Sequence, residues 1–342
     1  MPEKWIYKLD ELRSEHNEMV GKKCANLGEM AHLGMRVPPG FAISVGGYDL
    51  FMRETGAGEE IREYVRQRID TLSKNIERQI EASRHIRSVI ESKEMPEKMK
   101  HALWEQYDAL CEAVGIERVP VAARSSGAVS MPGQMETYLN VVGKKDLAKK
   151  VIKVWGSAFT TRAIAFRLEK NMEMDKAPIG VAVLKMVRAR SAGVTLTVLP
   201  TVGDLSKVIV EGNWGLGESV VSGEITPDSF VIDKKTGKIE STINTKLKMV
   251  VYKESGTAMV KVPADLQNMP CLNEAEILEI VRIAMDVEAH FDFPQDMEWV
   301  LDADMSFPEN LFWVQTRPAK FSKRKENDSE YLAELMSRVF KM

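Results

Sequence analysis

Hydrophobic periodicity changes once along this chain, and that change limits the folds open to it. Between Gly58 and about Gly115, apolar residues recur three and four positions apart with charged residues between them, as in amphipathic helices. From Val119 the chain becomes a series of short segments rich in β-branched residues, including VPVAA, TYLNVV, IGVAVLKMV, GVTLTVL and KVIVEG. Such segments are typical of strands. The sequence therefore predicts an α+β fold.

Helices and turns are also predicted among these strands. One helix is expected at about 146–169 and another at about 274–291, where Asn273 and Glu276 form a capping box. The KKTGK stretch is typical of a hairpin turn. Because the chain passes from helix-rich to strand-rich near 180–190, we predict an N-terminal lobe over 1–185, a C-terminal lobe over 186–320, and a charged linker with a short helix over 321–342.

Composition excludes several functional classes. The chain has 342 residues, 44% hydrophobic and 28% charged, which is typical of a soluble protein of about two domains. Its net charge of −3 gives no general affinity for nucleic acid or an anionic membrane. The three cysteines are far apart, and the apolar run at 179–187 is too short to cross a bilayer. We expect a cytoplasmic protein that binds neither nucleic acid nor a membrane.

Polar residues interrupt two predicted strands in DMEWVLDADMSFPENLFWVQTRP, residues 296–318. Side chains two apart on a strand share a face, so Asp296 lies with Glu298, and Gln315 lies with Arg317. If the strands pair, the four groups converge. An unpaired buried polar group costs about 2–7 kcal/mol, so this cluster needs mutual pairing, a metal or a ligand.

Three other segments are candidates for anion binding, each with a plainer alternative. In ARSSGAVSMPGQMET, residues 123–137, Arg124 is expected at a strand's end before a loop whose N–H and hydroxyl groups face phosphates, or before an ordinary surface loop. In VGKKCANLGEM, Gly21, Lys22 and Lys23 precede a predicted helix, and a lysine there is either a phosphate contact or a solvated surface residue. The glycine-rich EGNWGLGESVVSGEITPD, residues 211–228, is the third candidate because its turn carries acidic groups. Its plainer alternative is a tight turn in which glycine is needed only for positive φ angles.

Several common signatures are missing from the sequence. Neither G-x-x-x-x-G-K-[ST] nor G-x-G-x-x-G occurs, so the two commonest nucleotide fingerprints are absent. No G-x-S-x-G elbow supports a hydrolase triad. The five histidines are scattered without metal-binding spacing.

Taken together, these segments resemble the N-terminal nucleotide-binding domain of phosphoenolpyruvate synthase, pyruvate phosphate dikinase and rifampin phosphotransferase. The resemblance runs from about Val20 to Pro318 and follows the family's order of motifs. The motifs read GKK…LGEM…LGMRVPPGF, RSS, SMPGQMETYLNV, FTTRAIAFR, GLGESVVSGEITPD and DMEWV…VQTRP. It implies an ATP-grasp fold that holds the nucleotide between two lobes.

The resemblance also implies roles for individual residues. Lys23, Arg124 and Arg317 would contact phosphate and act in catalysis, while Glu298 and Gln315 would hold Mg²⁺ with support from Asp296. The implied nucleotide-binding set is Lys23, Arg124, Gly133, Thr137, Lys185, Met186, Val187, Glu211, Glu298, Gln315 and Arg317, with adenine near Lys185–Val187. The family often has a glutamine where this chain has Leu184, which bears on base selectivity.

The reaction implied by the family needs a group that this sequence lacks. Relatives pass a phosphoryl group to a histidine in a T-x-G-G…H-A setting, and none of the five histidines lies in such a setting. We therefore expect the ATP-binding subunit of a split dikinase. It would convert ATP to AMP and phosphate, with the β-phosphoryl group going to a histidine on a partner subunit. Phenol, as in phenylphosphate synthase, is the expected acceptor. A two-subunit phosphoenolpyruvate synthase and a non-catalytic ATP sensor are the alternatives.

Overall fold

The computed structural model describes residues 4–73, 75–127, 136–221, 223, 225–254 and 256–321, which fall into two compact units. Unit 1 comprises Met1–Arg190, Val250–Val260 and Val300–Thr316, and unit 2 comprises Ser191–Met249, Lys261–Trp299 and Arg317–Met342. Both units are therefore discontinuous in sequence. The division passes through the last two strands, β12 (Gln295–Asp302) and β13 (Leu311–Pro318).

Unit 1 contains a five-stranded antiparallel sheet in the order β1-β2-β5-β3-β4. Its strands are β1 (Ile6–Lys8), β2 (Gly40–Ile43), β3 (Pro120–Gly127), β4 (Thr137–Val142) and β5 (Ile179–Lys185). The central strand β5 has the burial expected of an apolar run, since only Lys185 at its end is not buried. Short helices η1 (Leu9–Glu11), η2 (Ser14–His16) and α1 (Asn17–Val20) lead into α2 (Lys22–His32).

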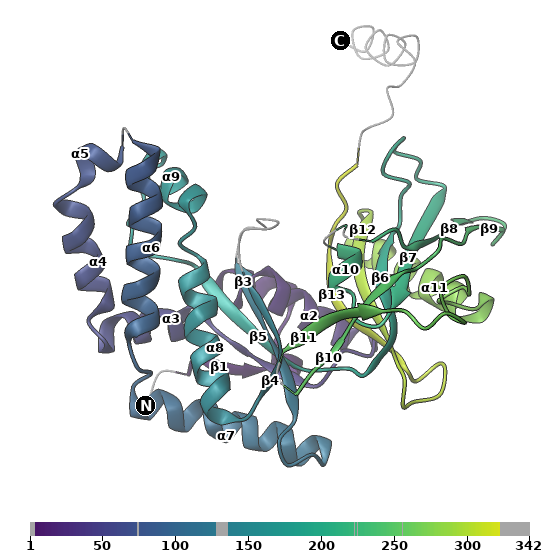
Figure 1. The fold of residues 1–342 in the computed structure, drawn as a ribbon, viewed down its shortest axis with the longest axis horizontal. Helices are drawn as coiled ribbons and strands as arrows, with labels where there is room; N and C mark the ends of the chain where they lie inside the picture. Colours follow the sequence, from purple (N-terminus) through teal and green to yellow (C-terminus); the bar gives the residue numbers. More distant parts are fainter. Residues whose placement is uncertain are drawn as a thin grey trace, which may run out of the picture. The chain divides into compact units, whose positions relative to one another are not determined.

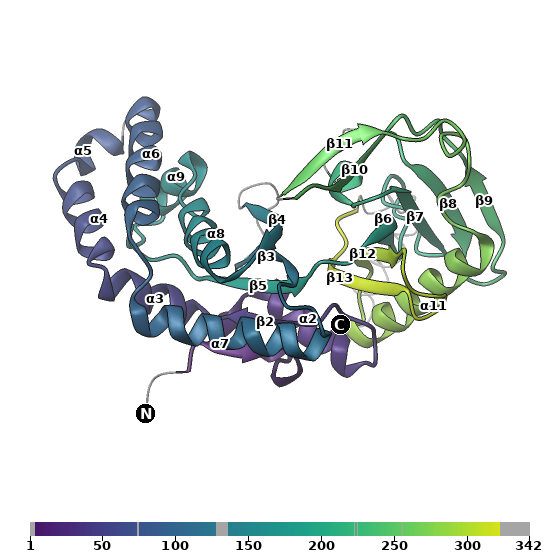
Figure 2. The same ribbon diagram turned by 60° about the horizontal axis from the view of Figure 1, so that its bottom comes forward.

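The helical region predicted between Gly58 and Gly115 is confirmed, and it joins the same core as the sheet. Its helices are α3 (Val45–Glu54), α4 (Ala57–Arg66), α5 (Ile69–Leu72), α6 (Ile76–Ser92) and α7 (Glu97–Val114). Figures 1 and 2 show α6 beside α8 (Lys144–Ser157) and α9 (Thr161–Glu169), and α6 packs on both.

The single helix predicted at about 146–169 is wrong, because α8 and α9 are separate. Thr160 has an extended backbone, and its side chain accepts a hydrogen bond from the Ala163 N–H at 3.2 Å. This side chain caps the first turn of α9, so a new helix begins here. The amphipathic pattern continues across the break and does not reveal it.

The six-stranded sheet has the order β13-β12-β6-β7-β8-β9, which places the two predicted C-terminal strands next to each other. The other strands are β6 (Ala189–Leu196), β7 (Lys207–Trp214), β8 (Asp228–Asp233) and β9 (Ile239–Thr242). A short α10 (Glu218–Val221) follows β7, and β10 (Lys248–Tyr252) pairs with β11 (Thr257–Lys261). The capping box predicted at Asn273 and Glu276 is confirmed at the start of α11 (Glu274–Phe291).

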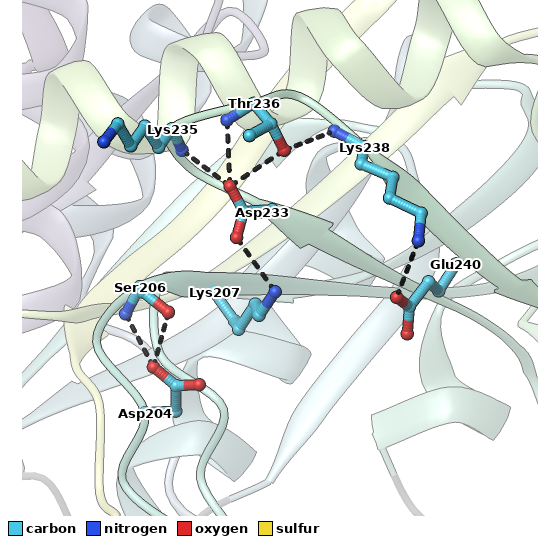
Figure 3. Close-up of polar contacts among 8 residues, drawn as sticks. All are labelled: Asp204, Ser206, Lys207, Asp233, Lys235, Thr236, Lys238 and Glu240. Carbon is cyan, nitrogen blue, oxygen red and sulfur yellow. Dashed lines mark hydrogen bonds and ion pairs between the residues drawn. The ribbon is translucent and has the colours of Figure 1, made fainter.

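The hairpin turn predicted at KKTGK is confirmed between β8 and β9. Figure 3 shows Asp233 at its centre: one carboxylate oxygen accepts from the N–H groups of Lys235 and Thr236 and from the Thr236 hydroxyl, and the other lies 2.9 Å from Lys207 Nζ. The Lys207 ammonium and these turn donors lower the pKa of Asp233. An aspartate that bonds the backbone two residues on is typical of such turns.

Asp228, the last residue of the GEITPD segment, forms a buried ion pair in unit 2. Lys246 Nζ lies 2.7 Å from Asp228 Oδ1, and both side chains are fully buried. The other oxygen of Asp228 accepts from the Cys271 N–H at 2.8 Å. The carboxylate therefore joins three stretches of unit 2, and its buried charge is paired as burial requires.

In the part of the chain that the structure describes, no helix is long and apolar enough to span a membrane. Cys24, Cys111 and Cys271 are buried, and none of the three forms a disulfide.

Candidate nucleotide and phosphate site

The start of α2 is fixed against the end of β3 in unit 1. Gly21 has φ +77°, and a Cβ at this position would lie 1.9 Å from the Ser126 carbonyl oxygen, so only glycine fits. The Cys24 N–H donates to Ser126 Oγ at 3.0 Å, which caps one free donor of the helix. The first turn of α2, which carries Lys23, is thereby anchored next to the strand that carries Arg124.

Arg124 also reaches the last strand within unit 1. Its Nη1 donates to the Val314 carbonyl at 2.8 Å, and its Nη2 donates to Gln315 Oε1 at 3.4 Å. Asn26 on α2 donates to the Thr316 carbonyl at 2.8 Å. Elements far apart in sequence thus bring Arg124 to Gln315 and hold α2, which carries Lys23, against β3 and β13. Asn26 could not be predicted from the sequence, because a buried asparagine on an apolar helix face gives no sign of its partner.

The pKa of the buried Cys24 thiol shows which charges act at the start of α2. Burial raises its pKa to about 12, against the opposing effects of the Ser126 hydrogen bond and of the positive charges on Lys23 and Arg124. Both cations therefore act on the same point at the start of α2. The thiol stays protonated at neutral pH and has no nucleophilic character.

The segment from Ala123 to Thr137, predicted to bind phosphate, does not begin with the loop expected after Arg124. Arg124 does not end its strand, because β3 continues to Gly127 and its last residues pair with Val181, Gly180 and Ile179 on β5. Ser125 and Ser126 are consequently buried, so their hydroxyls do not face an open anion site. Thr137 is exposed and lies directly across from Arg124 in the β3–β4 pairing. Gly133 lies outside the described residues.

The segment predicted to hold adenine follows β5. The Lys185 N–H donates to the Pro39 carbonyl at 2.7 Å, and the Met186 N–H donates to the Pro120 carbonyl at 2.8 Å. The Val187 carbonyl accepts from the Tyr252 hydroxyl, and Leu184 is buried within β5. Two backbone donors here are already engaged within unit 1, and the adenine contact stays a prediction.

Asp296 and Glu298 of β12 lie in unit 2 and share one face, as their spacing predicts. Met297 and Trp299 point to the opposite face and are fully buried, and the Trp299 ring packs on Gly193 and Gly212. Arg317 donates from Nε to Asp296 Oδ2 at 2.9 Å, and its Nη2 lies 2.8 Å from the same oxygen. Mutual pairing therefore accounts for two of the four polar groups of this region.

Burial raises the pKa of Asp296, Arg317 lowers it, and the negative charge of Glu298 raises it further. Glu298 is therefore close enough to act on Asp296. Glu211 on β7 lies between Val194 and Ser229 of the neighbouring strands, and burial raises its pKa. Unit 2 thus holds carboxylates that resist ionisation and favour a compensating cation.

Magnesium suits the chemistry of these donors. Carboxylate and amide oxygens are hard ligands, and Mg²⁺ is usually held by one or two carboxylates together with substrate phosphates and water. Among the residues that the structure describes, no three histidine, cysteine, aspartate or glutamate side chains gather into a protein-only metal site. The assignment of Glu298, Gln315 and Asp296 as ligands of such a metal stays a prediction.

The sequence of the chain matches a known protein family. The pyruvate phosphate dikinase AMP/ATP-binding domain matches residues 17–336. The chain belongs to this family. Its α+β architecture is of the ATP-grasp type, as the sequence predicted. It is an ATP-binding domain of the dikinase type.

Similar proteins are longer than this chain. It is 36% identical over 324 residues to the probable phosphoenolpyruvate synthase of Methanothermobacter thermautotrophicus, covering 92% of the chain and 46% of that protein. It is 37% identical over 342 residues to that of Methanocaldococcus jannaschii, covering 96% and 28%. It is 36% identical to the phosphoenolpyruvate synthase of Aeropyrum pernix, covering 96% and 44%. The chain spans less than half the length of these relatives.

Proposed function

We propose that this domain performs the ATP half-reaction of a dikinase. ATP, water and a histidine outside this sequence give AMP, phosphate and phosphohistidine, with the β-phosphoryl group on the histidine. A histidine nitrogen forms a bond to the β-phosphorus as the bond from that phosphorus to the oxygen it shares with the α-phosphate breaks, which releases AMP. Water attacks the γ-phosphorus as the bond from that phosphorus to the oxygen it shares with the β-phosphate breaks, which releases phosphate; the histidine N–H proton and one proton of the water pass to solvent. The observation that carries the proposal is the fixed position of Arg124. Its guanidinium donates hydrogen bonds to Val314 and Gln315, and its strand is bonded to the start of α2, which carries Lys23.

Phosphoryl transfer needs positioning and charge neutralisation more than covalent groups from the protein. Lys23 and Arg124 would neutralise phosphate oxygens, and the hydrogen bonds to β13 hold the Arg124 guanidinium in one orientation. Asp296 would hold the Arg317 guanidinium in the same way. Glu298 and Gln315 would bind Mg²⁺, which supplies further neutralisation of the phosphate charge when bound.

The acceptor is proposed from the names of the relatives. Because they are called phosphoenolpyruvate synthases, we propose phosphoenolpyruvate synthesis as the overall reaction. Phenol has no support from these proteins. The histidine would lie on a separate subunit or on another part of the same polypeptide.

The test uses the chain with Mg·ATP labelled in the β-phosphoryl group. The protein encoded by the adjacent gene supplies the histidine, or the full polypeptide does so if the histidine lies there. We expect acid-labile label on that histidine together with AMP. Release of ADP, or label on residues of this chain, would contradict the proposal. An ATP sensor would bind nucleotide without transferring label.

One substitution tests the metal site. Glu298→Gln keeps the size of the side chain but removes its charge, so we expect a folded protein whose transfer rate falls by about 10²-fold or more. Glu309→Gln, at an exposed position between β12 and β13, is the matched control and should be as active as the wild type. Normal transfer by Glu298→Gln would remove Glu298 from the site.

A further inference from the structure

Glu136, directly before β4, is held at both carboxylate oxygens and at its backbone N–H. Its Oε1 accepts from Arg87 Nη2 at 2.6 Å, its Oε2 accepts from the Tyr138 hydroxyl, and its N–H donates to Ser157 Oγ at 3.1 Å. Arg87 lies on α6 and Ser157 ends α8. Glu136 therefore links the start of β4 to α6 through its carboxylate and to α8 through its backbone N–H.

The charges around this carboxylate favour its ionised form. Burial pushes the pKa of Glu136 up, but hydrogen bonds from Tyr138 and Arg87 outweigh it and leave the pKa lowered. Lys150 Nζ lies 5.0 Å from the centre of the Tyr138 ring, and Glu91 lies 3.5 Å from Arg87 Nε. The link is therefore intact at neutral pH.

The residue after Glu136 is the one that faces Arg124. Neighbouring side chains on a strand point to opposite faces, so Thr137 points away from the helices that hold Glu136 and Tyr138. Thr137 is exposed and lies directly opposite Arg124, which is clamped to β13. Because Thr137 is the first residue of β4, its position depends on what holds the residue before it.

We propose that Arg87 is a positioning residue for phosphoryl transfer, which acts through Glu136 to fix Thr137 against Arg124. This role rests on the proposed function. A displacement of about 1 Å in a positioning group can cost on the order of 10²-fold in rate. The ion-pair partners of Arg87 are Glu136 and Glu91, so its proposed effect passes through Glu136 and not through direct contact with the nucleotide.

The test measures phosphoryl transfer and nucleotide binding separately. We expect Arg87→Ala to lower the transfer rate about tenfold or more while the Kd for Mg·ATP changes less than about twofold. Arg87→Lys retains a charge that reaches Glu136 and should recover most of the rate. Glu136→Ala should lower the rate as much as Arg87→Ala, and the double variant should lower it no further.

Arg78→Ala is the matched control, because Arg78 forms an exposed ion pair with Glu81 on the same helix. It should be fully active. Wild-type rates in Arg87→Ala would overturn the positioning role and leave the proposed function intact. A drop in melting temperature that accounts for the lost activity, with no recovery in Arg87→Lys, would also overturn it. Absence of transfer by the wild type would overturn both.

Discussion

At the scale of single residues, alternation along a strand is a reliable guide to direction but not to partner. The spacing of Asp296 and Glu298 predicted that they share a face, and the fully buried Met297 and Trp299 on the opposite face confirm it. The spacing did not predict that Arg317 would pair with Asp296. That contact depends on how two strands align, which neither strand encodes by itself.

Glu211 provides a test of the cost of holding a carboxylate in unit 2. Burial raises its pKa above the ordinary value of 4.5. Below 4.5 the folded and unfolded states are both protonated, so the carboxyl costs nothing. As pH rises past this value the unfolded chain ionises first, and stability falls until the pH exceeds the folded-state pKa.

Glu211→Gln should therefore raise the melting temperature at pH 7 but leave it unchanged at acid pH, and it should weaken nucleotide binding if Glu211 contacts the ligand. Thermal unfolding across this pH range measures the effect. Glu240→Gln, at an exposed position on β9, is the control. Equal stabilisation at both pH values would show that the charge is not the cause.

At the scale of helices and strands, local pattern predicted the type of most elements and failed at some ends. The helices after Gly58, the KKTGK turn and the Asn273 capping box follow from periodicity and turn chemistry. The end of β3 was wrong because Ser125 and Ser126 have polar side chains yet pair with β5. Tertiary pairing outweighed the turn-forming tendency of that segment.

Asn140 on β4 offers a test at this scale, because its backbone and its side chain both form hydrogen bonds with residues between β10 and β11. Its φ is +53°, its side chain is 4% exposed, and its Nδ2 donates to the carbonyls of Lys253 and Gly256 at 2.7 and 2.9 Å. These contacts hold the turn between β10 and β11 within unit 1. Two lost hydrogen bonds should cost about 2 kcal/mol.

Asn140→Gly should therefore lower the free energy of unfolding by about 2 kcal/mol, since glycine accepts the left-handed backbone. Asn140→Ala should cost about 1 kcal/mol more, because alanine disfavours that conformation. Urea denaturation of both variants measures the difference. If alanine were no worse than glycine, the backbone at this position would not be under strain.

At the scale of the whole molecule, the division of the chain into two compact units is the property that the sequence pattern indicates least. The expected boundary near residue 185 makes each lobe continuous and stays a prediction; the compact unit 1 includes Val250–Val260 and Val300–Thr316 in addition to Met1–Arg190. Contacts from Asn26, Arg124 and Asn140 hold these segments. Such long-range pairing is encoded jointly by distant segments, so no composition shift marks it.

The last prediction follows from this discontinuity. A fragment covering Met1–Arg190 would lack Leu311, Phe312 and Trp313, which are 3%, 5% and 0% exposed. Burying such side chains stabilises a protein by about 1.5–3 kcal/mol each, and a whole domain is stable by only about 5–15 kcal/mol. Arg124 and Asn26 would also lose their acceptors on β13.

We therefore expect the Met1–Arg190 fragment to unfold at much lower urea concentration than the full chain, or to aggregate, although it contains every strand of the five-stranded sheet. A chain nicked by protease between β12 and β13, at the exposed residues 306–309, is the control. It keeps all the residues and should remain folded, because β13 stays bound. A fragment as stable as the full chain would mean that unit 1 does not need β13.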